Sequence, residues 1–236
     1  MMTKILSRAF DGAPREALPP LRDLLRGALS EYVAMTLFVF FGCGAAASNV
    51  SKVNGEWDPG STTIIALQFG LTITVLAYAI AHTSGGHINC AVTFGLMVVG
   101  KCHPVRGLLY LIAQLSGSIT GAALLLGGTH LDASALDRSG TLGANGLQNP
   151  SVTVGNAFLF EFMGTFLLMF VVLESAVNAY SVTTDGESSI LGNKMNLAPI
   201  PIGFAVFVAH VVCIPVTGCS INPTRSFGPA VVSGYW

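Results

Sequence analysis

A short segment occurs twice in this chain, 133 positions apart, and restricts the possible fold more than any other feature. The first copy, at residues 84–95, reads SGGHINCAVTFG, and the second copy, at residues 217–228, reads TGCSINPTRSFG. In both copies a loop of small residues leads to an Asn, and Phe-Gly follows five and six positions later. A repeat on this scale in an apolar chain indicates two structurally similar halves that share one central site.

The composition predicts an integral membrane protein. Hydrophobic residues make up 52% of the chain and charged residues only 10%, against a charged share of about 25% in soluble domains. The net charge of −1 argues against a nucleic-acid partner. The five cysteines lack the spacing of a disulfide scaffold or a zinc site. Because no nucleophile–base pair or metal-ligand set is visible either, we expect no enzyme, no metal and no cofactor.

Five apolar segments are long enough to cross a bilayer. They are expected at residues 28–48, 62–82, 104–127, 154–180 and 198–217. Two shorter segments, 89–99 and 222–232, cannot cross a hydrocarbon core of about 30 Å, so each is predicted to be a re-entrant half-helix. Non-helical backbone is tolerated at membrane depth only inside protein or beside water. Two such segments therefore imply a cavity or pore.

The predicted fold is an all-α membrane protein built from an inverted repeat. Its parts are a cytoplasmic N-terminal segment (1–27), a first repeat (28–128), an extracellular connecting loop (129–153) and a second repeat (154–236). Three spans in the first repeat, an odd number, force the second repeat to insert upside down. Eight of the eleven basic residues lie on the side of the first segment and two on the other, which predicts a cytoplasmic N-terminus.

The repeat also predicts a sixth span that the sequence does not contain. The partner of the third span would begin at about position 237, whereas the last residue is Trp236. We therefore expect a truncated sequence that lacks this span; a naturally five-span protein is the alternative.

The two repeated Asn residues, Asn89 and Asn222, are predicted to cap the half-helices. A cap Asn accepts a backbone N–H of the first turn through its side-chain oxygen, which leaves its NH₂ group free to donate into the cavity. Two helix N-termini aimed at one point attract a water oxygen and repel cations. The alternative is a pair of ordinary buried caps. The backbone carbonyls expected to line the pore belong to Gly85, Gly86, His87, Ile88, Gly218, Cys219 and Ser220.

Arg225 lies three residues into the second half-helix. A guanidinium at membrane depth is costly and usually faces the protein interior or a water-filled cavity. In a pore its fixed positive charge would exclude protons and other cations. The alternative is a structural ion pair.

These residues resemble the aquaporins of the major intrinsic protein family, which carry two Asn-Pro-Ala boxes, the second followed by Arg. The resemblance covers residues 29–236. The segments GGHIN (85–89), AVTFG (91–95) and LAPIPIGFA (197–205) are similar to plant plasma-membrane aquaporins. The resemblance implies a water-selective channel driven by osmotic gradients, a homotetramer and a location in the plasma membrane.

The family's narrow filter matches four residues of this chain, namely Phe69, His210, Cys219 and Arg225. This set is similar to that of water-selective members, because glycerol-conducting relatives generally replace the His and follow the Arg with Asp. Taken without the resemblance, His210 is better explained as a satisfied buried histidine, and Cys219 is also consistent with an inert small apolar residue. The resemblance places Cys219 at the pore wall, open to thiol reagents. It also implies that two buried acids, Glu31 and Glu161, brace the half-helix loops.

Both boxes depart from the family pattern. In the first box Cys90 stands where the family has Pro, which restores a backbone N–H at the start of the half-helix. In the second box Thr224 replaces Ala, and its hydroxyl either forms a local hydrogen bond or crowds the opposing half-helix. Because both Asn residues are present, we expect the pore to be kept.

Three other functions remain open from the sequence. The same fold also suits a facilitator of small neutral solutes such as hydrogen peroxide, ammonia or glycerol. A secondary transporter shares the inverted repeat but needs ion-coordinating residues at the midplane, where only Arg225 and histidines are available. The altered boxes are also compatible with a non-conducting adhesion or regulatory homologue.

Overall fold

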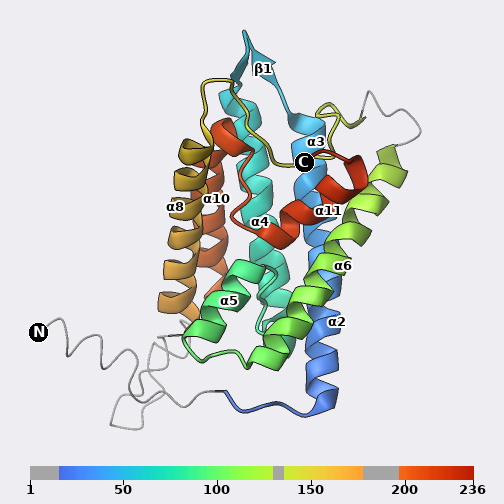
Figure 1. The fold of residues 1–236 in the computed structure, drawn as a ribbon, viewed down its shortest axis with the longest axis vertical. Helices are drawn as coiled ribbons and strands as arrows, with labels where there is room; N and C mark the ends of the chain where they lie inside the picture. Colours follow the sequence, from blue (N-terminus) through green and yellow to red (C-terminus); the bar gives the residue numbers. More distant parts are fainter. Residues whose placement is uncertain (1–15, 130–135, 178–196) are drawn as a thin grey trace, which may run out of the picture.

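The computed structural model describes residues 16–129, 136–177 and 197–236 (Figure 1). Most of the predicted N-terminal segment, part of the connecting loop and the end of the fourth predicted span lie outside these residues. The described part is a bundle of long helices that surrounds two short ones, as the inverted-repeat fold requires. The predicted fold class is thereby confirmed.

Five helices of the described residues are long and apolar enough to cross a membrane. The first combines α2 (Leu21–Phe38), a π-helical turn (Val39–Cys43) and α3 (Gly44–Asn49), and the fourth combines α8 (Val154–Val172) with another π-helical turn (Leu173–Val177). The remaining three are α4 (Pro59–Ser84), α6 (Pro104–Thr129) and α10 (Pro199–Thr217). The first helix begins seven residues before its predicted start, because its opening turns carry charged residues that an apolar criterion leaves out.

The half-helices are α5 (Cys90–Val98) and α11 (Pro223–Ser233). Figure 1 shows both near mid-height, between the long helices. Each follows a loop that begins where a long helix ends at a left-handed glycine, with φ of 92° at Gly85 after α4 and 78° at Gly218 after α10. Because glycine adopts this conformation without a steric penalty, the same residue type ends the helix in both repeats.

A small hairpin between the first two long helices was not predicted. Its strands, β1 (Lys52–Val53) and β2 (Glu56–Trp57), pair antiparallel. The turn between them is Asn54-Gly55, and both residues have positive φ. Asn-Gly is a strong signal for a two-residue hairpin turn, so the sequence did contain the information.

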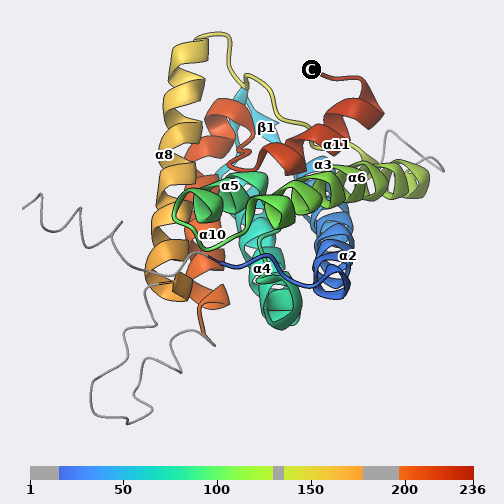
Figure 2. The same cartoon turned by 60° about the horizontal axis from the view of Figure 1, so that its bottom comes forward.

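Small residues allow the long helices to approach closely. A side chain at Gly117 of α6 would meet the carbonyl oxygen of Tyr32 on α2 at 2.5 Å, and one at Gly70 of α4 would meet that of Gly203 on α10 at 2.7 Å. Such contacts are typical of helix association in membranes, where close packing replaces the hydrophobic effect. Figure 2, which turns the bundle, shows α5 and α6 in front of α4 and α10.

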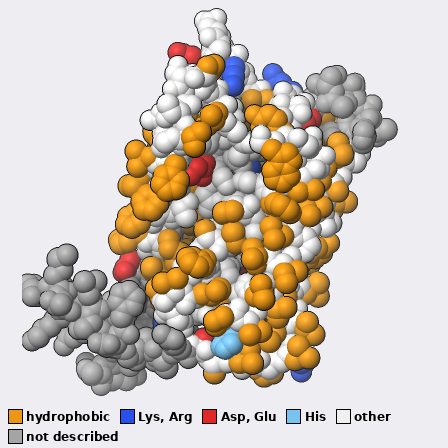
Figure 3. Space-filling model, in the orientation of Figure 1, with side chains coloured by type: hydrophobic (Ala, Val, Ile, Leu, Met, Phe, Trp, Pro, Cys, Tyr) orange, Lys and Arg blue, Asp and Glu red, His pale blue; other side chains and the backbone are white. Residues whose placement is uncertain are grey.

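The outside of the bundle suits a lipid environment. Figure 3 shows hydrophobic side chains over most of the middle of the visible face, with most of the charged side chains near the two ends. Large apolar side chains project outward along α8, among them Phe158, Phe162, Phe166 and Phe170. The protein is therefore an integral membrane protein with several spans.

Gly228 provides a test of the packing of α11. A Cβ at this position would collide with the backbone carbonyl of Ser118 on α6. We expect Gly228→Ala to lower the free energy of unfolding by about 1–3 kcal/mol, because overpacking forces the backbone to shift. Thermal unfolding in detergent measures the loss. Gly127→Ala on α6 is the matched control, since nothing lies within 4 Å of its Cβ; an equal loss there would contradict the explanation.

Candidate functional site

The loop before α5 is organised by the carboxylate of Glu31, which is fully buried. It accepts hydrogen bonds from the backbone N–H groups of His87 (2.9 Å) and Ile88 (2.7 Å). Two side chains also donate to it, the hydroxyl of Ser84 at 2.7 Å and the amide of Gln114 at 2.9 Å. Because a carboxylate holds several donors at once, this one residue fixes the path of the loop.

Glu161 does the same for the loop before α11. Its carboxylate accepts from the backbone N–H groups of Ser220 (2.8 Å) and Ile221 (2.6 Å) and from the hydroxyl of Thr217 (2.5 Å). The two acids are therefore equivalent in their loop contacts. They differ in burial, because Glu161 is only half-buried.

One isoleucine in each loop has an unusual backbone conformation. The φ angle is 48° at Ile88 and 44° at Ile221, a region that β-branched residues rarely adopt. Such strain persists only where the surroundings hold the residue in place. Here the N–H of each Ile is bound by the acid of its own repeat, and its carbonyl is bound by the other repeat.

The bond to that carbonyl comes from the capping Asn of the opposite half-helix. Asn89 donates through Nδ2 to the Ile221 carbonyl at 2.8 Å, and Asn222 donates to the Ile88 carbonyl at 2.7 Å. Both also cap their helices, since Asn89 Oδ1 accepts from the N–H of Ala91 (2.8 Å) and Asn222 Oδ1 from that of Arg225 (3.1 Å). Each NH₂ group thus uses one hydrogen within the protein, and only its second hydrogen is left for the cavity.

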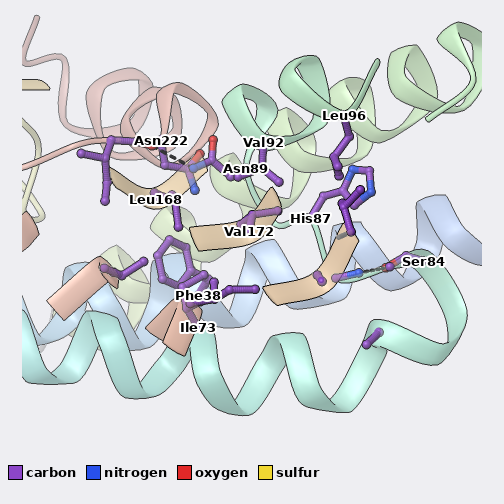
Figure 4. A pocket seen from close by; sticks show the side chains of 18 of the residues that line it. Phe38, Ile73, Ser84, His87, Asn89, Val92, Leu96, Leu168, Val172 and Asn222 are labelled. Atoms are coloured by element: carbon purple, nitrogen blue, oxygen red, sulfur yellow. Dashed lines mark hydrogen bonds between the residues drawn. The ribbon is translucent and has the colours of Figure 1, made fainter. Parts of the chain in front are cut away.

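Both Asn residues line a cavity of about 480 Å³, here called the inner cavity (Figure 4). It runs from Lys101 and Arg106, where α6 begins, to His210 on α10. Apolar side chains of Phe38, Ile73, Leu168 and Val172 form much of its wall near the two Asn residues (Figure 4). Of the residues whose carbonyls were expected to line the pore, it is lined by Gly85, Gly86, His87 and Ser220.

A second cavity of about 490 Å³, here called the outer cavity, lies at the hairpin end of the bundle and is bordered by Lys52, Arg138 and Gly218. The two cavities are separated by a layer of side chains, here called the wall. Its position follows from the residues of α4 and α10 that border each cavity. On α4, Ile65 borders the outer cavity and Ile73 the inner one, so Phe69 lies one turn from each. On α10, His210 borders the inner cavity and Ile214 the outer one.

The side chains of Phe69, His210 and Arg225 meet at this wall. The rings of Phe69 and His210 stack with centroids 4.5 Å apart, and the guanidinium of Arg225 lies 4.8 Å from the Phe69 centroid. None of the three is more than 1% exposed, so their mutual contacts fill the space between the cavities. The structure thus brings together three of the four residues that were predicted for the filter.

Several polar atoms at this wall have no partner. His210 Nδ1 bonds the Val206 carbonyl at 2.9 Å, but His210 Nε2 and two guanidinium nitrogens of Arg225, Nε and Nη2, make no hydrogen bond. Within the described residues no carboxylate forms an ion pair with Arg225. Buried polar groups are normally satisfied, so this cluster is suited to a small hydrogen-bonding solute.

Cys219, the fourth predicted filter residue, is also buried, but it has no exposed surface and borders neither cavity. Its backbone N–H donates to the hydroxyl of Thr217 at 3.1 Å. This buried position differs from the expected one, in which the Cys219 thiol lies at the pore wall and is open to reagents. The carbonyls of Ile88 and Ile221 accept hydrogen bonds from the Asn amides, so this bonding capacity is used within the protein.

Asn145, in the loop before α8, was missed by the sequence analysis. Its Oδ1 accepts hydrogen bonds from Arg225 Nη1 and from the Ser226 hydroxyl, the latter at 2.6 Å. Its Nδ2 donates to the Thr217 carbonyl at 3.4 Å. The residue therefore fixes the orientation of the guanidinium. Because it has no counterpart in the first repeat, the repeat comparison gave no signal for it.

Gln114 was missed as well, although a signal existed. It is a fully buried amide in the middle of a predominantly apolar span, and polar residues in that position are usually functional or paired. In the described part of the chain, no three His, Cys, Asp or Glu side chains are close enough to hold a metal ion.

Comparisons with known proteins agree with this architecture. Residues 21–236 match the family described as Major intrinsic protein. Among similar proteins, Aquaporin-1 of Sus scrofa is 38% identical over 211 residues, which cover 88% of this chain and 72% of that protein. Probable aquaporin PIP2-5 of Arabidopsis thaliana is 37% identical over 240 residues, with coverage of 95% and 80%.

A solved structure shares the fold. It is the aquaglyceroporin from Plasmodium falciparum, with a TM-score of 0.71 and 25% identity, and the match covers 90% of this chain and 83% of that one. The paired half-helices, the two Asn caps and the sequence matches lead to one conclusion: the chain belongs to the major intrinsic protein family, the channel family that includes the aquaporins.

Proposed function

We propose that the protein is a passive water channel that excludes glycerol, protons and ions. Water would pass from the outer cavity between Phe69, His210 and Arg225 into the inner cavity and past the two Asn caps. The proposal needs no catalysis and no cofactor, because the flux follows the osmotic gradient. We further propose that the N-terminus is cytoplasmic, that the channel is a homotetramer and that it lies in the plasma membrane.

The observation that carries the proposal is the cluster of unpaired nitrogens on His210 and Arg225 in a wall that side chains fill. A single water molecule can accept from the guanidinium and also bond His210 Nε2. Larger solutes need space that the stacked rings of Phe69 and His210 occupy. The unpaired positive charge supports exclusion of cations, as do the two half-helix N-termini at the pore centre.

Glycerol conduction is the main alternative, and the likeness to an aquaglyceroporin structure favours it. A non-conducting homologue is a second alternative. It is favoured by the burial of Phe69, His210 and Arg225, since each is at most 1% exposed, so conduction requires some side-chain movement at the wall.

Stopped-flow light scattering of proteoliposomes separates these functions. In a sucrose gradient, a water channel shrinks the vesicles faster than empty liposomes of the same lipid. In a glycerol gradient, the same vesicles shrink and stay small if glycerol is excluded, and re-swell if it is conducted. Shrinkage no faster than that of empty liposomes, with protein that elutes as a folded species, would contradict the proposal and favour the non-conducting homologue.

A further inference from the structure

The two departures from the Asn-Pro-Ala pattern contact each other. The backbone N–H of Cys90, at the start of α5, points to the side chain of Thr224 in α11, with a distance of 3.3 Å from nitrogen to hydroxyl oxygen. Proline at position 90 would have no N–H to donate, and alanine at position 224 would have no oxygen to accept it. We propose that Cys90 and Thr224 are a matched pair whose hydrogen bond links the two half-helices directly across the pore centre.

The Thr224 hydroxyl also extends this link to the second cap. Its hydrogen goes to Asn222 Oδ1 at 2.7 Å, a closer acceptor than Gln114 Oε1 at 3.4 Å. The hydroxyl therefore accepts from one half-helix and donates to the cap of the other. Because Asn222 Oδ1 is held by this hydroxyl and by the N–H of Arg225, its NH₂ group stays directed at the Ile88 carbonyl. Thr224 is thus a positioning residue for Asn222.

The burial of Thr224 makes the pairing specific. Its side chain has no exposed surface, so the hydroxyl depends on partners within the protein, whereas Cys90 is half-buried. With threonine present, a proline ring at position 90 would place its Cδ where the Cys90 N–H now approaches the hydroxyl. Each departure alone therefore creates a defect, either an N–H that loses its partner in the protein or a steric clash, and only the two together avoid both. This inference does not depend on which solute the channel conducts.

Thermal unfolding of four versions of the full chain tests the pairing. Thr224→Ala and Cys90→Pro are each expected to lower the Tm by about 2–4 °C, the shift that a loss of about one hydrogen bond causes in a protein of this size. The double variant, which restores Asn-Pro-Ala in both boxes, is expected to unfold close to the original temperature. If the two losses simply add, the residues do not act as a pair and the proposal is overturned.

A spectroscopic test covers the case in which Cys90→Pro does not fold. Protein labelled with ¹⁵N only at its five cysteines gives five amide signals, and Cys90→Ala identifies the one from position 90. Thr224→Val, which keeps the shape but removes the hydroxyl, is expected to move that signal upfield and leave the other four in place. Thr224→Ser, which keeps the hydroxyl, is expected to leave all five unchanged. An unmoved Cys90 signal in Thr224→Val would overturn the proposal.

Discussion

Replacing His210 by Gly is expected to convert the channel into one that admits glycerol. The imidazole stacks on Phe69 and fills one side of the wall between the cavities. Its removal leaves a gap beside Arg225 Nε and Nη2, which are unpaired and able to bind the hydroxyl groups of glycerol. We expect glycerol permeability to rise about tenfold or more over empty liposomes, equivalent to lowering a barrier by about 1.4 kcal/mol.

The measurement is the re-swelling of proteoliposomes in a glycerol gradient, with the amount of protein per vesicle matched between variants. His82→Gly is the control, because His82 lines the inner cavity and is exposed, away from the wall. It loses the same side chain, and the vesicles are expected to keep excluding glycerol. If His210→Gly folds and glycerol still does not enter, His210 does not limit the size of the solute.

Replacing Glu31 by Gln is expected to have the largest effect on folding. Each carboxylate oxygen accepts two hydrogen bonds, Oε1 from Ser84 and His87 and Oε2 from Ile88 and Gln114. A glutamine NH₂ group cannot accept, so two donors lose their partner inside a fully buried site. At about 1.5–3 kcal/mol for each bond to a charged acceptor, we expect a loss of about 3–6 kcal/mol in the free energy of unfolding.

Glu161→Gln is the matched comparison for this substitution, because Glu161 has the equivalent loop contacts in the second repeat. Glu161 Oε1 accepts from Thr217 and Ser220, but Oε2 accepts only from Ile221. A glutamine NH₂ group in place of Oε2 therefore leaves one donor without a partner instead of two, and the loss is expected to be clearly smaller. Thermal unfolding and the fraction of monodisperse protein in detergent report both losses. Equal losses for the two variants would show that the number of bound donors does not decide the contribution of these acids.

Much of the fold could be predicted because its signals are local. Apolar stretches long enough for a bilayer predicted the five spans. The half-helices and their Asn caps followed from the repeated segment, since a cap is fixed by its own first turn. The meeting of Phe69, His210 and Arg225 came from the family resemblance, because no spacing rule relates three separate helices.

Features that depend on contacts between distant segments could not be predicted in this way. The crossing of each Asn amide to the opposite loop needs the relative placement of two half-helices, which no local pattern contains. The contact of Asn145 with Arg225 depends on the path of an irregular loop. The different burial of Glu31 and Glu161 was hidden because the repeat shows both as the same residue type in the same position.

The crossed amide–carbonyl bonds at the pore centre also have a consequence for biosynthesis. The partners of Asn89 and of the Ile88 carbonyl lie 132 and 134 residues further along the chain. At about 5–20 residues per second, a ribosome needs on the order of ten seconds to make that stretch. During this time the Ile88 carbonyl lacks its partner, and the strained first loop is held only by contacts within the first repeat, chiefly those of Glu31. We therefore expect the first half-helix of a stalled nascent chain to remain open to protease until the second box has emerged.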